Sequence, residues 1–230
     1  MNDDRHLDDL EHYLQTARVL EFGDPQLSGA HGQKIRLRLE GGVQALAKPE
    51  SGIGEGHRVT RREVAAWIFA REIGVSDMVA CTVLRDDLEL LDGTRGAASV
   101  QVVWPQPLTA DYQGQFPEGD QWAAAVLDAV IAHSDRVGHN WLGVPSEAGD
   151  FRLKLVDHGY AFGLQGGLNS TFYNTLNGQQ IPEERLRGLR SCGSPRQERQ
   201  LQALFESEEQ ELQNAIDRAQ QLAETGVLTI

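Results

Sequence analysis

The strongest constraint on the fold is an alternation of side chains that begins at Lys34. The stretch KIRLRL, residues 34–39, alternates basic and apolar residues with the period of a strand that buries one face. Glu40 and two glycines supply a tight turn, and a second apolar stretch follows at residues 43–47. The sequence therefore predicts an antiparallel hairpin, so the fold contains an antiparallel sheet.

The residues around this hairpin predict a sheet with one main helix. A short amphipathic helix is expected near residues 7–14, and further strands are expected in ARVLEFG, MVACTVLR and GAASVQVVW. The main helix is predicted over TRREVAAWIFAREIG, where Gly74 ends it. Asp92 and Gly93 provide the turn between the last two strands. We therefore expect residues 1–105 to form one lobe.

Helical patterns dominate the second half of the chain. The segment DQWAAAVLDAVIAHS is apolar along one helical face, and Asp120 is its candidate N-cap. A short pair of strands, NWLGV and FRLKLVD, follows. Two more helices are predicted to begin near Pro182 and Arg196, the last with an apolar stripe from Leu201 to Leu222. The predicted fold class is α+β, with the N-terminal sheet lobe followed by a mostly helical lobe in residues 106–230.

Composition and charge exclude several classes of function. A formal net charge of −13 gives no long-range attraction to nucleic acids or anionic membranes, since both require Lys and Arg to neutralise phosphates. Two cysteines are too few for a disulfide framework or a cysteine-built zinc site, which favours a reducing compartment. The acidic start MNDDRHLDDLEHYL is unlike a secretory signal. We therefore expect a cytoplasmic protein that binds neither nucleic acid nor membrane.

Oxygen-bearing side chains follow the predicted helix and the last predicted strand of the second half. Asp135 and Asn140 lie close together in a polar segment, and Asp157 ends a strand just before His158 and Gly159. The glycine permits backbone conformations that other residues avoid. Mg²⁺ prefers oxygen ligands, usually one or two carboxylates completed by phosphate oxygens and water. We therefore predict Asn140 and Asp157 as metal ligands, and Asp135 as the acceptor of a proton from an attacking hydroxyl. The alternative is that Asp135 and Asn140 only form a turn.

Phosphoryl transfer also needs a cation on the nucleotide phosphates, and Lys48 is the candidate. It ends the second strand of the hairpin in ALAKP, with Leu46 on the same face. A buried lysine needs a carboxylate partner, and Glu63 on the following helix is the predicted one. Two alternatives remain: Thr60 and Glu63 match a capping box, and Lys48 suits the solvated end of a strand.

These residues resemble those of a known group of kinases over nearly the whole chain. The stretches that carry the likeness are ALAKP, REVAAWIFAREIG, TVLRD, HSDRVGHNWL and VDHGYAFG. They are similar to the kinase-like fold in the branch of the phosphoinositide 3- and 4-kinases and the HipA-type kinases. The likeness is greatest to small bacterial proteins of that branch, which share a lysine followed by proline, a helix like REVAAY and a DHG signature. IPEERLRGL and AETGVLTI also fit their tail.

The resemblance implies a two-lobed protein-kinase-like fold with ATP and Mg²⁺ between the lobes. Its implied roles are phosphate binding by Lys48, support of that lysine by Glu63, catalysis by Asp135, and metal binding by Asn140 and Asp157. Val103 and Trp104 are assigned to the nucleotide site as well. The segment QLSGAHGQ occupies the place of a phosphate-covering loop, with backbone amides at Ser28, Gly29 and Gly32 as candidates to hold phosphate oxygens.

The chain departs from the phosphoinositide kinases at two motifs. The phosphoinositide kinases have a DRH motif, in which the histidine directly follows the arginine. Here Val137 follows Arg136, and His139 lies three positions beyond that arginine. His139 is therefore a second catalytic candidate, which either stabilises the transferred phosphoryl group or neighbours the metal ion. His158 replaces the phenylalanine of DFG. His133 is interpreted as a structural residue that contacts the last carbonyls of its helix.

The function predicted from these residues is ATP- and Mg²⁺-dependent phosphoryl transfer to a hydroxyl of a protein or a small molecule. The altered motifs keep two alternatives open, a nucleotide-binding pseudokinase and a nucleotidyl (AMP) transferase. Ser170, Thr171 and Tyr173 are possible modification sites, or simply part of a polar surface loop.

Overall fold

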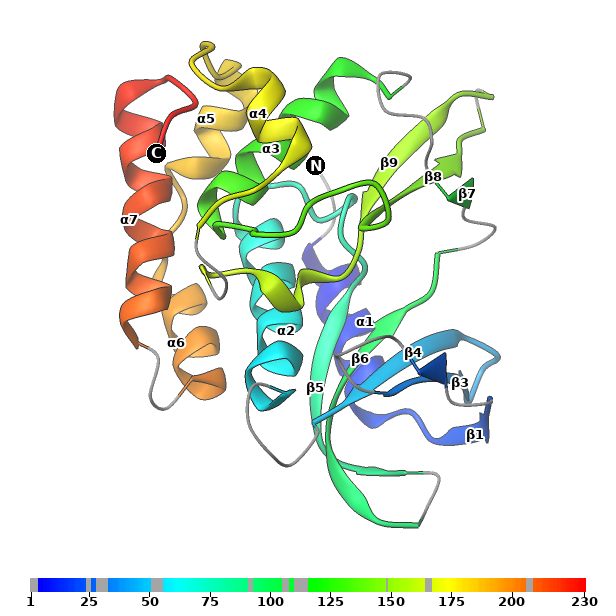
Figure 1. Ribbon diagram of the computed structural model, residues 1–230. Helices are drawn as coiled ribbons and strands as arrows, with labels where there is room; N and C mark the ends of the chain where they lie inside the picture. The colour runs from blue at the N-terminus through cyan, green and yellow to red at the C-terminus, as the bar shows by residue number, and fades with distance from the viewer. Residues whose placement is uncertain are drawn as a thin grey trace. The chain divides into compact units, whose positions relative to one another are not determined.

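The computed structural model describes residues 4–23, 26–27, 33–50, 56–90, 93–104, 108–109, 116–147, 149–163, 167–205 and 209–230. By its internal contacts the chain divides into two compact units. Unit 1 is Met1–Val64 with Ala80–Val103, and unit 2 is Ala65–Val79 with Trp104–Ile230 (Figure 1). The α+β class with an N-terminal antiparallel sheet is confirmed. The predicted lobe boundary near residue 105 stays a prediction, and so do the separate functional roles of residues 1–105 and 106–230.

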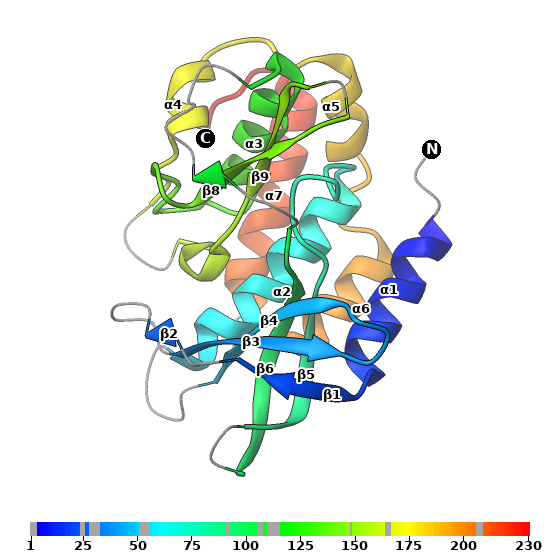
Figure 2. The ribbon, with the colours of Figure 1, turned by 90° about the vertical axis from the view of Figure 1, so that its right-hand side faces the viewer.

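Unit 1 is built on an antiparallel sheet. Its strands lie in the order β1-β3-β4-β6-β5, and β2 pairs with β3. Their bounds are Val19–Phe22 (β1), Gln26–Leu27 (β2), Gln33–Leu39 (β3), Gln44–Pro49 (β4), Thr82–Glu89 (β5) and Arg95–Val102 (β6). Helix α1, Asp4–Thr16, contacts β5 and β6, as can be followed in Figure 2.

Strands β3 and β4 form the hairpin that the alternation predicts. Ile35 lies opposite Ala47, and both side chains are buried. The turn uses Gly41 and Gly42, whose φ angles of 85° and 86° lie in the left-handed region that favours glycine. The predicted hairpin and its turn are therefore confirmed.

Helix α2, Gly56–Glu72, starts before the predicted position at Thr60. Thr60 therefore lies inside the helix, and its hydroxyl donates to the backbone oxygen of Lys48 at 3.4 Å. The capping-box interpretation of Thr60 and Glu63 is wrong, because a cap precedes the first turn of a helix. The helix ends before Gly74, whose φ of 73° matches the predicted stop.

Helices dominate unit 2. Helix α3, Glu118–Val130, contacts α4, α5, α7 and β9, and residues 122–130 of it are buried. The other helices are α4 (Thr171–Leu176), α5 (Glu183–Leu189), α6 (Pro195–Leu204) and α7 (Glu209–Thr225), with a 3-10 turn η2 at His158–Tyr160. A small sheet, β7-β8-β9, consists of Leu108–Thr109, Trp141–Pro145 and Phe151–Leu155. The predicted strand pair NWLGV and FRLKLVD corresponds to β8 and β9.

Two details of unit 2 differ from the sequence prediction. Pro117 is the N-cap of α3, and Asp120 lies within the first turn. The Asp120 carboxylate is buried and accepts from the guanidinium of Arg152 at 2.9 and 2.6 Å and from the Leu153 amide at 3.0 Å. The predicted capping role of Asp120 is therefore wrong, because its carboxylate holds β9 instead. The apolar stripe assigned to one final helix is shared by α6 and α7.

Across the described ranges, every helix is too short or too polar to cross a bilayer.

Candidate active site

Lys48 and Glu63 form a buried ion pair in unit 1. Strand β4 places Lys48 between β3 and β6, and α2 supplies Glu63. The ammonium donates to Glu63 Oε1, and the two side chains are only 9% and 1% exposed. The predicted pairing is confirmed, and Lys48 is not a solvated strand-end lysine. Because the pair is buried, each side chain offsets the charge of the other where water does not.

Buried polar groups share the sheet face of Lys48. Lys48 lies opposite Ser99 on β6, and Gln101, two residues further, lies opposite both Leu46 and Thr82. Ser99, Gln101 and Thr82 are all buried. Residues directly opposite each other in a sheet project from the same face. These residues were not predicted, although Ser99 and Gln101 alternate with apolar neighbours in ASVQV, which marks a polar face.

Asp135 and Asn140 are in direct contact in unit 2. They belong to the loop that follows α3, in which Asp135 is half-buried and Asn140 is buried. The Asn140 side-chain amide donates to Asp135 Oδ2 at 3.0 Å and to the Asp135 backbone oxygen. Asn140 therefore holds the carboxylate of Asp135, and its Oδ1 is the atom left for another ligand.

Asp157 has an unusual backbone conformation. Its φ of 60° and ψ of 67° are left-handed, and it is the N-cap of η2. Asp and Asn adopt this region more readily than most other residues, at some cost in strain. The sequence analysis assigned the special conformation to Gly159, but the positive φ lies at Asp157. Ala132, with φ 44°, and Phe162, with φ 61°, are strained in the same way near this loop.

His133 joins the loop of Asp135 to Asp157. The backbone amide of Asp135 donates to His133 Nδ1 at 3.2 Å, so the proton is on Nε2, which lies 3.1 Å from the Asp157 carbonyl oxygen. Burial, and then the charge of Arg136, lowers the pKa of His133 well below its usual value. His133 is therefore a neutral connector. Its ring contacts these two loops rather than the last carbonyls of α3.

Arg136 makes a second connection between the same segments. Its Nη1 donates to the backbone oxygens of Asn140 at 2.7 Å and Val156 at 2.6 Å. Its Nε donates to both oxygens of Asp128, at 3.1 and 3.2 Å. Arg136 and Asp128 are completely buried. The arginine therefore fixes the backbone at Asn140 and directly before Asp157.

Asp128 and Ser170 belong to this network, and the sequence analysis missed both in this role. The Ser170 hydroxyl donates to Asp128 Oδ2 at 2.7 Å, across 42 positions of sequence. Ser170 is completely buried, and Tyr173 is buried as well. The interpretation of Ser170 and Tyr173 as surface or modification sites is therefore wrong. A polar residue in the apolar stripe of α3 is the signal that marks Asp128 in the sequence.

Among the described residues, His139, Val103 and Trp104 have other surroundings. His139 is exposed on the same loop. The Val103 amide donates to the Gln44 backbone oxygen at 3.1 Å in unit 1. Trp104, in unit 2, has the Lys154 ammonium 4.7 Å from its ring centroid, a cation–π distance. Ser28, Gly29 and Gly32 lie outside the described residues.

Asn140 and Asp157 offer an amide oxygen and a carboxylate to a metal ion. Within the described part of the chain, no group of three or more His, Cys, Asp or Glu is placed to hold an ion. A hard divalent cation accepts such oxygen donors, and phosphate oxygens and water complete its shell. Asn140 and Asp157 therefore supply two of the donor types that such an ion accepts.

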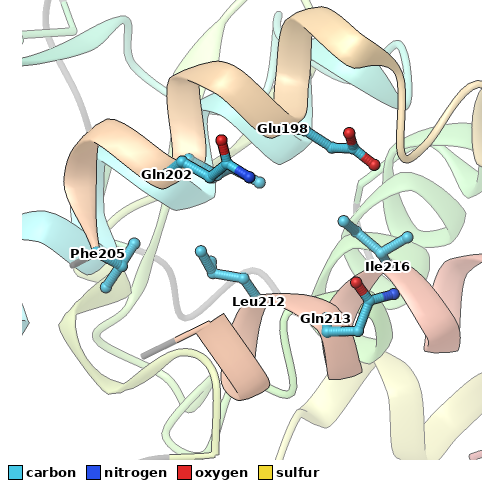
Figure 3. A pocket seen from close by; sticks show the side chains of 7 residues that line it. Glu198, Gln202, Phe205, Leu212, Gln213 and Ile216 are labelled. Atoms are coloured by element: carbon cyan, nitrogen blue, oxygen red, sulfur yellow. The ribbon is translucent and has the colours of Figure 1, made fainter. Parts of the chain in front are cut away.

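A pocket in unit 2 lies apart from these residues, between α6 and α7. It has a volume of about 240 Å³ and is lined by Glu198, Leu201, Gln202, Phe205, Leu212, Gln213 and Ile216 (Figure 3). This volume is below the range of about 300–1,000 Å³ that is typical of small-molecule sites. None of the predicted site residues lines it.

Comparisons with known proteins show what fold carries these residues. No protein-family model matches the chain, and no curated protein matches it in sequence. A crystal structure of the Golgi casein kinase matches with a TM-score of 0.63 and 15% identity, covering 99% of this chain and 77% of that chain. A second crystal structure, of the Golgi casein kinase with Mn/ADP bound, matches with a TM-score of 0.64 and 15% identity, over 99% and 76%.

The fold is kinase-like. This confirms the fold class that the sequence predicts. At 15% identity the likeness concerns the fold alone. The narrower placement in the branch of the phosphoinositide 3- and 4-kinases and the HipA-type kinases stays a prediction, as no matching sequence or family model supports it.

Proposed function

We propose that this chain is a phosphotransferase that moves the γ-phosphoryl group of ATP to a hydroxyl of a protein or a small molecule, with Mg²⁺ as the metal ion. The observation that carries the proposal is the linkage of Asp135, Asn140 and Asp157 by hydrogen bonds through His133 and Arg136. A kinase-like fold, with a neighbour that has Mn/ADP bound, supports it. The confirmed Lys48–Glu63 pair supports it as well.

The proposed mechanism assigns one task to each residue. Asp135, oriented by the Asn140 amide, accepts the proton of the attacking hydroxyl. Lys48, paired with Glu63, neutralises the nucleotide phosphates. Asn140 and Asp157 would hold the metal ion, which when bound would offset the charge on the phosphate oxygens. Because phosphoryl transfer depends mostly on positioning and charge neutralisation, these tasks are sufficient for catalysis.

The proposal is tested by incubating the purified protein with γ-labelled ATP, Mg²⁺ and a mixture of hydroxyl acceptors. We expect Asp135→Ala and Asp157→Ala to lower transfer and ATP hydrolysis by about 100-fold or more. Asp150→Asn is the control, because Asp150 is exposed on the turn between β8 and β9, where its carboxylate accepts from the nearby Ser146 hydroxyl. Equal turnover in wild type, Asp135→Ala and Asp157→Ala would refute the catalytic assignment.

Two further measurements separate the alternatives. Calorimetry with ATP and Mg²⁺ identifies a pseudokinase, which binds the nucleotide tightly but releases no γ-phosphate. Mass spectrometry of a modified acceptor distinguishes an added phosphoryl group from an added AMP. Absence of nucleotide binding would refute all three functions.

A further inference from the structure

We infer that Ser170 and Asp128 are positioning residues that hold the Asp135 loop in its reactive geometry. The inference rests on the proposed phosphotransfer and extends it to two residues that touch neither nucleotide nor acceptor in that proposal. All the residues involved belong to unit 2.

Ser170 has two hydrogen-bonding tasks at once. As the N-cap of α4, its oxygen accepts from the Tyr173 amide at 3.2 Å. Its hydroxyl proton is donated to Asp128 Oδ2 at 2.7 Å. A cap alone requires only an acceptor. The donated hydrogen bond toward α3 is therefore an additional feature of this serine.

Asp128 transmits this contact to Arg136. Its two oxygens accept from Arg136 Nε at 3.1 and 3.2 Å, while one of them also accepts from Ser170. The three side chains are completely buried, so water offers no competing partners. Hydrogen bonds to charged groups in such surroundings are stronger than those at a surface. The serine therefore limits how the carboxylate can turn against the guanidinium.

The backbone around Ser170 holds Arg136 as well. The Arg136 amide donates to the Asn169 oxygen at 3.0 Å, and the Thr171 amide donates to the Arg136 oxygen at 3.1 Å. Arg136 and Ser170 thus form a parallel bridge between two segments. Arg136, the residue directly after Asp135, is therefore held by this bridge at its backbone and by Asp128 at its side chain.

These contacts bear on the proposed reaction through Asp135 and Asp157. Arg136 is adjacent to Asp135, and its Nη1 holds the oxygens of Asn140 and Val156. A small displacement of Arg136 would move the Asp135 carboxylate and the metal-binding aspartate relative to each other. Misplacement of about 1 Å can cost about 100-fold in rate. Loss of the Ser170 hydroxyl should therefore affect the chemical step more than nucleotide binding.

The chain offers a matched control in Ser194. Ser194 is the N-cap of α6, and its oxygen accepts from the Gln197 amide at 3.2 Å, the same distance as in the α4 cap. Ser194→Ala and Ser170→Ala therefore remove equivalent caps in the same unit. Of these two serines, Ser170 is the one that also donates to Asp128.

The experiment compares wild type, Ser170→Ala, Ser170→Thr and Ser194→Ala. We expect Ser194→Ala to lower Tm by about 2–4 °C, because it loses one cap, and Ser170→Ala to lower Tm by more, because it also loses the buried hydrogen bond to Asp128. Ser170→Ala should lower kcat about tenfold with KM for ATP within about twofold of wild type. Ser194→Ala should change neither constant by more than about twofold, and Ser170→Thr, which keeps the hydroxyl, should recover most of kcat. Hydrogen exchange of residues 133–140 should be faster in Ser170→Ala only.

The outcomes separate this inference from the proposed function. Transfer by wild type, with equal kcat in Ser170→Ala and Ser194→Ala, would overturn the positioning role and leave phosphotransfer standing. A rise in KM for ATP with unchanged kcat would overturn it as well. Absence of transfer by wild type would overturn the proposed function. Unchanged exchange in residues 133–140 of Ser170→Ala would then show, independently of activity, that the serine does not hold the loop.

Discussion

Arg136 is completely buried, and Asp128 supplies the carboxylate against its charge. Removing the charge of one partner leaves the other buried and uncompensated, which is more costly than the loss of a surface contact. We therefore expect Asp128→Asn to lower the free energy of unfolding by about 3–5 kcal/mol. Urea denaturation followed by circular dichroism measures this change.

Glu21→Gln is the matched control for Asp128→Asn. Glu21 pairs with Arg38, and both side chains are exposed. Solvent and salt screen such a pair, so its loss should leave the free energy of unfolding nearly unchanged. Equal losses in the two variants would contradict the argument that burial determines the cost.

Cys192 predicts a pH dependence of stability. Burial raises the pKa of its thiol from 9.0 to about 12. The folded pKa is above the unfolded one, so the associated stability is complete below the unfolded value and is lost as pH rises toward the folded value. Between about pH 9 and about pH 10.5, wild type should lose about 2 kcal/mol more unfolding free energy than Cys192→Ala. Urea unfolding of both proteins at several pH values measures the difference, and parallel pH curves would contradict the prediction.

Among the elements, those with a clear side-chain period could be predicted from the sequence. The alternation in KIRLRL and the glycines after it led directly to β3, β4 and their turn. The ends of helices were harder to predict because capping residues also have other uses. Asp120 is a good capping residue, but its carboxylate bonds Arg152, which is 32 positions away. Such a long-range partner has no signal in the local pattern.

Helix α5 comes unusually close to the residue that follows α2. A Cβ atom built on Gly188 would lie 2.0 Å from the carbonyl oxygen of Ile73. The obstacle is backbone, so relief would require a shift of one of the two segments. We therefore expect Gly188→Ala to lower the free energy of unfolding by about 1–3 kcal/mol. Thermal and urea unfolding both measure the effect.

Gly119→Ala is the control for Gly188→Ala. Gly119 lies in the first turn of α3, and a Cβ atom there meets nothing within 4 Å. Alanine is the better helix former, so this variant should be unchanged or more stable by up to about 1 kcal/mol. If Gly188→Ala were as stable as Gly119→Ala, the close approach of α5 to Ile73 would not exist in solution.

At the scale of the whole molecule, the kinase-like fold was predicted from the sequence. Lys48 and Glu63 are in contact as predicted. Asp135 and Asn140 are in contact as well, which was not predicted. Asp128 and Ser170 could not be assigned to the site, because only the folded chain brings them to Arg136. The apolar neighbours of Asp128 mark it as a buried polar residue, but nothing in the local sequence links it to Ser170 or Arg136.

Binding of a nucleotide with a metal ion should stabilise the whole protein by mass action. A ligand at about 100 times its Kd contributes about 2.7 kcal/mol if it binds only the folded state. For a chain of 230 residues, this corresponds to a rise in Tm of about 5–10 °C. We expect this rise with ATP and Mg²⁺ or Mn²⁺ together, and a smaller one with ATP alone, measured by thermal denaturation.

Asp157→Asn isolates the contribution of the metal ion to this rise. Asn keeps the side-chain size and tolerates the left-handed backbone that Asp157 adopts, so the free protein should remain folded. The variant loses the carboxylate charge and should therefore lose the part of the rise that depends on the metal ion. Asp150→Asn removes the same charge from an exposed position and should keep the full rise. An equal metal-dependent rise in Asp157→Asn and wild type would show that the ion does not use Asp157, and the assignment of this aspartate would have to be withdrawn.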